Sequence, residues 1–199
     1  MSNPIPLEYG KYYHIYNRGI NRANIFFEDR NYPYFLKLYA AHIEPIADTY
    51  AYCLLYNHFH FLVRIKQVME LDLTGLQDLS GLKKTSQYFS NMFNAYTKAI
   101  NKAYNRTGAL FQRPFGRIEV TAEDYFVNLI TYIHQNPQRH GLVADFRTWL
   151  YSSYHALLST QPTRLQREVV LTWFNGPAGV EATHRQKIIE HPLAPEDFD

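Results

Sequence analysis

Two kinds of apolar spacing alternate along the first 140 residues of the chain. Residues 11–16, 49–56, 58–65 and 115–120 are rich in aromatic and β-branched residues, which favour strands. Between these segments apolar residues recur every three to four positions, which is typical of amphipathic helices. The helical patterns run from Tyr34 to His42, from Leu82 to Tyr104 and from Tyr125 to Asn136. We expect Pro137 and Gly141 to end the third helix.

The predicted order is strand, helix, strand, strand, helix, strand, helix. A βαββαβ order is typical of an α+β, ferredoxin-like (RRM-like) fold, an antiparallel sheet with two helices on one face. Ligands are then expected on the open face of the sheet or at a helix beside it. We predict one domain over residues 1–155, a polar loop at 68–81, and a C-terminal extension over 156–199 that packs on the domain. Within the extension, residues 165–174 and 180–189 have short helical patterns.

The composition changes this picture little. The chain has 199 residues, of which 46% are hydrophobic and 19% charged, so a disordered or collagen-like chain is excluded. A single cysteine, Cys53, permits no internal disulfide and no cysteine-based zinc cluster. No apolar run approaches the roughly 20 residues of a membrane helix, and the N-terminus lacks a signal-peptide pattern. We therefore expect a cytoplasmic protein, with no membrane partner.

The charge is distributed unevenly, although the net charge is only +2. Between Lys83 and His140 there are eight Lys or Arg residues against three acidic residues, and aromatic residues make up 16% of the chain. This combination suits a phosphate backbone with bases that can be stacked. A solvated helix face and an aromatic core explain the same numbers, and composition alone favours that simpler interpretation.

The first candidate site is His58-Phe59-His60. Side chains alternate along a strand, so the two imidazoles lie on one face about 7 Å apart and can converge on a divalent metal. A bare His-x-His pattern more often means two surface histidines. Here the apolar residues at 61–63 predict a buried, rigid strand, which favours the metal site.

The second candidate is Tyr132, which shares a helical face with Asn136 at i+4. A tyrosine nucleophile needs a phosphorus electrophile, a metal to polarise the phosphate and a 3′-OH leaving group. The Asn136 amide oxygen is a hard ligand suited to Mg²⁺ or Mn²⁺. Alone, Tyr132 is one of 17 tyrosines and is expected to be a partly buried helix residue. The combination with His58 and His60 makes it a candidate.

Four arginines are candidate phosphate contacts. Arg113 and Arg117 flank the aromatic residues Phe111 and Phe115, which could stack a base, while Arg18 and Arg22 follow the first strand. An ordinary aromatic loop with surface arginines is about equally consistent with each of these residues taken singly.

These motifs resemble those of a known family. The histidine segment is similar to the HUH signature (His, hydrophobic, His) of single-strand DNA transposases, and its branch resembles the REP-associated tyrosine transposases and their insertion-sequence relatives. Five motifs match in order over roughly residues 10–155: Tyr16–Gly19 with Ile25-Phe26, Asn57–Val63, Phe111–Arg113, Tyr132–Pro137 with Gly141–Val143, and Trp149 with Ser152–Tyr154.

The resemblance implies an RRM-like sandwich in which His58 and His60, helped by Asn136, bind Mg²⁺ or Mn²⁺. It implies that Tyr132 attacks a DNA phosphate, giving a 5′-phosphotyrosine and a free 3′-OH. The implied substrates are single-stranded DNA ends that carry hairpins, and the activity is expected at the nucleoid. Members occur as monomers and as homodimers, and the sequence leaves this open. This sequence departs from the family at Leu55-Tyr56, where Met-Pro is frequent in members, and at His134, where members can carry Tyr.

Two other classes stay open. A non-catalytic single-stranded nucleic-acid-binding module could stack bases on the sheet aromatics, but the RNP aromatic motif of RRM proteins is not evident. A metal-dependent hydrolase could use His58 and His60, but the sequence offers no convincing third ligand of the zinc type. The absence of a GxxxxGK[ST] loop agrees with DNA rejoining that conserves the phosphodiester energy and needs no ATP.

Overall fold

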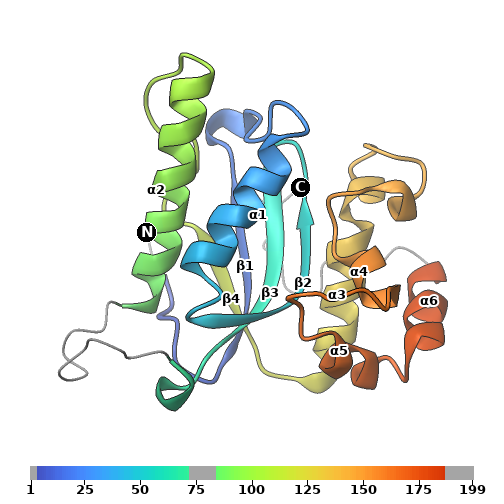
Figure 1. The fold of residues 1–199 in the computed structure, drawn as a ribbon. Coiled ribbons are helices and arrows are strands. Elements are labelled where there is room, and N and C mark those ends of the chain that lie inside the picture. Colours follow the sequence, from blue (N-terminus) through green and yellow to red (C-terminus); the bar gives the residue numbers. More distant parts are fainter. Residues whose placement is uncertain (1–3, 72–83, 187–199) are drawn as a thin grey trace.

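A four-stranded antiparallel sheet forms the centre of the protein (Figure 1). The computed structural model describes residues 4–71 and 84–186. The strands are β1 (Tyr12–Arg18), β2 (Ala47–Leu54), β3 (His58–Ile65) and β4 (Gly116–Val120), in the order β2-β3-β1-β4. Both central strands pair antiparallel with their neighbours, which is the strand order of a ferredoxin-like sheet.

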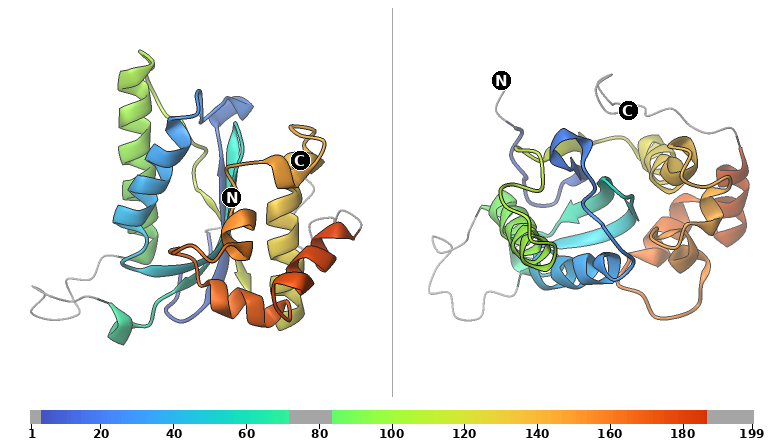
Figure 2. Two further views of the ribbon diagram at one scale, coloured as in Figure 1. Left: turned by 45° about the vertical axis from the view of Figure 1, so that its right-hand side comes forward. Right: turned by 90° about the horizontal axis from the view of Figure 1, so that it is seen from above.

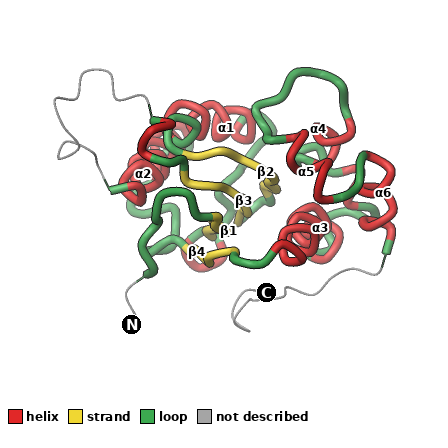
Figure 3. The backbone as a smooth tube through the Cα atoms, turned by 90° about the horizontal axis from the view of Figure 1, so that it is seen from below, coloured by secondary structure: helices red, strands yellow, loops and turns green. Residues whose placement is uncertain are grey.

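The helices lie on both sides of this sheet. Helices α1 and α2 cover one face, while α3 lies on the opposite side together with α4, α5 and α6 (Figures 2 and 3). Their bounds are α1 Asn31–His42, α2 Thr85–Ala103, α3 Glu123–Arg139, α4 Tyr154–Leu158, α5 Arg167–Trp173 and α6 Pro177–Arg185. Three 3₁₀ turns, at Ile20–Arg22, Val68–Glu70 and Phe146–Thr148, complete the described elements. The predicted α+β class and element order are confirmed.

Strand β3 shows how the sequence produces the two layers. Phe59 lies on the α1–α2 side, where its ring centroid is 5.2 Å from that of Phe35 in α1 and 5.6 Å from that of Phe93 in α2. Because side chains alternate along a strand, His58 and His60 lie on the other face, toward α3. The aromatic face therefore builds the core with α1 and α2, and the histidine face meets α3.

The end of α3 differs from the sequence prediction. The helix continues through Pro137 and ends at Arg139; Gly141, two residues further on, has a φ of 67°, the left-handed conformation that glycine adopts easily. Pro137 removes one backbone donor from the last turns. Next to it, the Asn136 side chain donates a hydrogen bond to the Tyr132 carbonyl at 2.9 Å, which adds a donor to the same turn.

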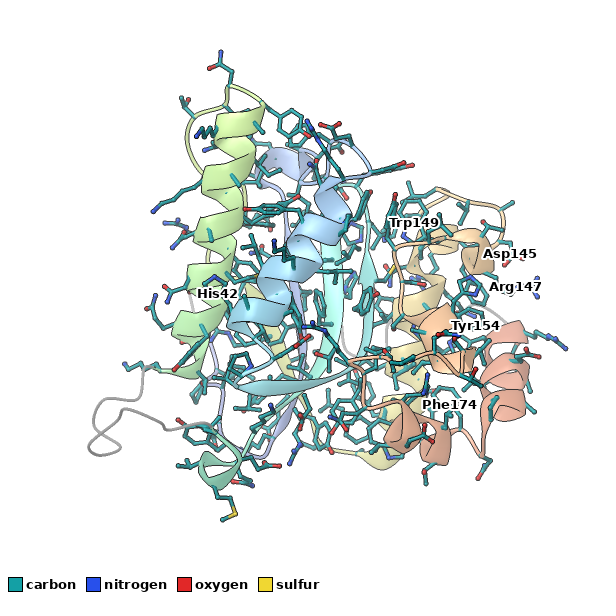
Figure 4. All side chains as sticks on the ribbon, viewed as in Figure 1. His42, Asp145, Arg147, Trp149, Tyr154 and Phe174 are labelled. Carbon is teal, nitrogen blue, oxygen red and sulfur yellow. The ribbon has the colours of Figure 1, made fainter. Side chains whose placement is uncertain are left out.

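The segment after α3 covers the edge of β2. Trp149, labelled in Figure 4, donates its indole N–H to the Leu54 carbonyl at 2.9 Å. Backbone hydrogen bonds join Leu54 N–H to the Tyr151 carbonyl and Ser153 N–H to the Tyr52 carbonyl. Further along β2, the Thr49 carbonyl accepts from Gln166 N–H, ahead of α5. The outer edge of this strand is thus largely paired.

A buried line of hydrogen bonds ties α6 to α3. His184 donates from Nδ1 to the Val180 carbonyl at 2.7 Å, so its Nε2 is an acceptor, 2.9 Å from His134 Nδ1. His134 Nε2 in turn lies 2.7 Å from Ser153 Oγ. Burial lowers the pKa of both histidines, for His184 to about 4, although its bond to Val180 opposes the shift. Tyr154 and Phe174, labelled in Figure 4, pack their rings within 5.2 and 5.6 Å of the His184 ring.

Several predictions fall partly outside the described residues: the 68–81 loop beyond Leu71, the start of the second helix and the end of the 180–189 pattern. The division of the chain at residue 155 stays a prediction. Within residues 4–71 and 84–186, no helix is both long enough and apolar enough to cross a membrane.

We expect His184 to make folding sensitive to acid. The unfolded histidine takes up a proton near pH 6.5 but the folded one only near pH 4, so stability is lost as the pH falls below about 6.5, by up to about 3 kcal/mol. His184→Gln removes this contribution. Urea unfolding at pH 7 and pH 5 should therefore show a smaller drop in midpoint for this variant than for wild type, with His42→Gln as control. Equal drops would contradict the assignment.

Candidate active site and nucleic-acid interface

His58 and His60 are held on β3 by the register with β1. His58 pairs with Arg18 and His60 with Tyr16, so all four side chains share the face toward α3. The two imidazole centroids are 5.2 Å apart, and both side chains are buried. The predicted placement of the two histidines on one face of a rigid strand is confirmed.

Hydrogen bonds orient each imidazole through Nδ1. His58 Nδ1 lies 2.7 Å from Asn57 Oδ1, an atom that can only accept, so Nδ1 carries the proton and Nε2 has the lone pair. His60 Nδ1 lies 2.9 Å from His14 Nε2 on β1. In both rings Nε2 is therefore the nitrogen not used in these bonds. Such outer bonds fix the tautomer of metal-binding histidines in general.

At this face, His58 Nε2 and Asn136 Oδ1 are buried, and neither has a hydrogen bond of ordinary geometry among the described residues. The two side chains do interact with each other, since the Asn136 side chain affects the pKa of His58. A buried acceptor without a donor is costly, and a bound cation is one common explanation. One imidazole nitrogen and one amide oxygen, with His60 beside them, suit a divalent ion of the Mg²⁺ or Mn²⁺ type. The described residues contain no group of three or more His, Cys, Asp or Glu that could hold a metal.

The electrostatics keep His58 neutral. Burial, with smaller effects from His140 and Arg18, lowers the pKa of His58 to about 3, while the Asn136 side chain opposes the shift. A neutral imidazole is the form that binds metal. Protons therefore compete weakly for Nε2 near neutral pH.

Helix α3 brings Tyr132 to the histidine face. The Tyr132 ring centroid is 5.7 Å from that of His60 and 6.4 Å from that of His14. The Arg139 guanidinium lies 5.1 Å from the centre of the Tyr132 ring. Tyr132 is only 1% exposed, so the arrangement is closed around the phenol. A ligand would reach the hydroxyl only if the covering side chains moved.

Sequence reasoning missed three residues that surround the site, namely His14, Arg139 and His140. The His140 ring lies 4.8 Å from the His58 ring, and His14 contacts His60 as described. Two signals were present in the sequence. His14, Tyr16 and Arg18 are spaced two residues apart, so they share one face of the strand. Arg139 follows Tyr132 by seven residues, which is nearly two helical turns.

The four predicted arginines gather around the loop that precedes β4. Arg18, Arg22 and Arg117 line a cavity of about 480 Å³, and Arg113 lines a neighbouring one of about 500 Å³. Among the described residues, no acidic side chain lines either cavity. Arg117 pairs with Ile15 in the register, so it lies on the α1–α2 face, whereas Arg18 lies on the histidine face. The arginine-lined region thus wraps around one end of the sheet.

A ferredoxin-like sheet with a His-x-His strand beneath a tyrosine-bearing helix is the arrangement implied by the resemblance to HUH-type single-strand DNA transposases. The similarity to the REP-associated tyrosine transposases is confirmed in sequence and in fold. A Haemophilus influenzae protein whose name assigns it to this family is 26% identical over 113 residues, 54% of this chain. The chain spans 59% of the length of that relative.

A solved structure extends the similarity to three dimensions. It is a REP-associated tyrosine transposase bound to a REP hairpin, with a TM-score of 0.60, 16% sequence identity, and coverage of 81% of this chain and 88% of the other. At this identity the match demonstrates the shared fold. No protein-family model matches the chain.

At the border of the site, the ring of Tyr16 leaves no room for a side chain at Gly116. A Cβ atom there would lie 1.7 Å from Cε2 of Tyr16, the cross-strand neighbour whose ring covers this glycine. We expect Gly116→Ala to destabilise the fold by about 1–3 kcal/mol, because the Tyr16 ring must shift. In a Tyr16→Ala background the same substitution should cost almost nothing. Urea unfolding of the four proteins measures this coupling, and an equal cost in both backgrounds would refute it.

Proposed function

We propose that the protein cleaves and rejoins single-stranded DNA at hairpin-bearing ends, with Tyr132 as the nucleophile and a divalent metal at His58, His60 and Asn136. The observation that carries the proposal is the meeting of α3 and β3. It brings a tyrosine, two imidazoles and a buried amide oxygen to one small region. The relative bound to a REP hairpin supports a hairpin-bearing DNA substrate.

His58 and His60 would hold the metal through Nε2 and Asn136 through Oδ1. The metal would polarise the scissile phosphate and stabilise the charge that develops on it. For His60 to offer the Nε2 lone pair, its Nδ1 must carry the proton and donate to His14 Nε2. His14 is therefore a positioning residue, which selects the productive tautomer of His60.

Tyr132 supplies the new bond. A phenol has a pKa of about 10 and is mostly protonated at neutral pH, so nearby positive charge is needed to favour the phenolate. Arg139 lies over the ring and Arg18 is on the facing strand. In the step proposed, the phenol gives up its proton, its oxygen bonds to phosphorus and the bond from phosphorus to the 3′ oxygen breaks. That oxygen takes up a proton and leaves as the 3′-OH.

Cleavage replaces one phosphate ester bond with another, so the energy of the phosphodiester is retained. The reverse attack by a 3′-OH can therefore rejoin the strand. Arg18, Arg22, Arg113 and Arg117 would bind the flanking phosphates, since they line two cavities at one end of the sheet. The alternative of a non-catalytic module that stacks bases on the open sheet is weaker. Helix α3 covers the histidine face on which such stacking would occur.

Tyr132→Phe should abolish the covalent adduct and leave DNA binding within about twofold of wild type, because only the attacking oxygen is lost. The assay is a denaturing gel of protein incubated with hairpin-bearing single strands and Mg²⁺ or Mn²⁺. Tyr125→Phe, on the same helix, is the matched control and should retain the adduct. An adduct in Tyr132→Phe would identify another tyrosine as the nucleophile. No adduct in wild type would favour the binding module.

Metal binding should depend on both histidines and on their orientation. We expect His58→Ala and His60→Ala each to abolish detectable Mn²⁺ binding in calorimetric titration. His14→Phe should weaken binding about 10–100-fold, the usual effect of losing an orienting hydrogen bond. His14→Gln retains an acceptor oxygen and should recover most of the affinity. Equal affinities in His14→Phe and wild type would remove the positioning role of His14, and wild-type affinity in both alanine variants would remove the site.

A further inference from the structure

We propose that the slot between α2 and residues 109–115, on the sheet face away from the histidines, binds one unpaired base of a DNA strand held at the histidine face. The slot has a volume of about 290 Å³. The proposal deepens the proposed function and rests on it for the identity of the strand as DNA. It assigns base recognition to a place that the catalytic chemistry does not use.

The lining of the slot suits a nucleobase. Three buried phenylalanines, Phe93, Phe111 and Phe115, provide apolar walls. The lining also includes six uncharged side chains that can form hydrogen bonds: Asn17, Ser86, Ser90, Asn94, Thr97 and Gln112. Planar apolar surface combined with amides and hydroxyls is what proteins offer to single bases. The described part of the chain contributes no acidic residue to this lining.

The polar residues on α2 form one strip. Ser86, Ser90, Asn94 and Thr97 follow each other at intervals of three or four residues, so they share one helical face. Asn94 accepts a hydrogen bond from Arg113 at 3.2 Å, which connects the strip to the loop across the slot. This strip faces the pocket in the middle of a helix whose opposite side packs in the core.

Arg117 is suited to bind the phosphate that belongs to the base. Its guanidinium carbon lies 4.0 Å from the centre of the Phe115 ring. Its Nε is buried without a hydrogen-bond partner among the described residues, and burial lowers the pKa of this side chain. A partly desolvated cation is costly unless an anion compensates it. A DNA phosphate would supply that charge.

The slot is connected to the histidine face. Asn17, Gln112, Phe115 and Arg117 line both the slot and the 480 Å³ cavity. Tyr16 and Arg18, which share the face of His58 and His60, line that cavity as well. A strand bound near the histidines can therefore pass around the start of β4 and place one base in the slot. A double helix is too wide to enter a slot of this volume, so the base must be unpaired.

The test compares two labelled single strands in metal-free buffer, dT12 and a 12-residue abasic strand with the same phosphates. Fluorescence anisotropy should show that wild type binds dT12 about 10-fold more tightly, since stacking contributes free energy for each bound base. Asn94→Ala, an exposed position, and Ser90→Phe, which fills the slot, should reduce this preference to within about threefold. Arg117→Gln should weaken binding to both strands.

Lys98→Gln is the matched control, because Lys98 is exposed on α2 and does not line the slot. It should keep the preference for bases. An unchanged preference in both Asn94→Ala and Ser90→Phe would overturn the proposal. Adduct formation by Tyr132, measured separately, distinguishes this failure from that of the proposed function. If wild type forms the adduct and the slot variants keep the preference for dT12, only the proposed base site is refuted. If the slot variants lose the preference but wild type forms no adduct, only the proposed catalysis is refuted.

Discussion

The antiparallel pairing of β1 with β3 is the constraint on which the site depends. It places His14 where its ring meets His60, and Arg18 opposite His58. A shift of one residue in this register would turn both histidines toward the phenylalanine core and bring Phe59 and Phe61 to the α3 side. The aromatic core therefore also fixes the positions of His58 and His60, because burial of Phe59 and Phe61 against α1 and α2 holds the register.

The sequence predicted those features that depend on local periodicity. The common face of His58 and His60 follows from the alternation of a strand, and the shared face of Tyr132 and Asn136 follows from the helical repeat. The meeting of these two faces was predicted through the resemblance of the motifs, and the structure has it. The roles assigned to these four residues stay predictions.

Other features depend on tertiary contacts that no local pattern encodes. Pro137 was expected to end α3, but the helix continues to Arg139, with the Asn136 side chain bonded to the Tyr132 carbonyl. The extra turn is what brings Arg139 over the Tyr132 ring. Arg117 faces away from the histidines because of the pairing of β4 with β1, a contact between segments about 100 residues apart. The bond between His134 and His184 likewise joins residues 50 positions apart.

The covered edge of β2 bears on how the protein behaves if it is shortened. Open strand edges are templates for pairing with other chains, and natural sheets protect them. Here the protection comes from the chain beyond α3, and Gln166 contributes it at the Thr49 end of the strand. A chain cut at residue 155 would retain the bonds made by Tyr151 and Ser153 but would leave that end of β2 without its cover. The C-terminal extension thus pairs an edge that would otherwise be open to other chains, and its helix α6 also contacts the tyrosine helix.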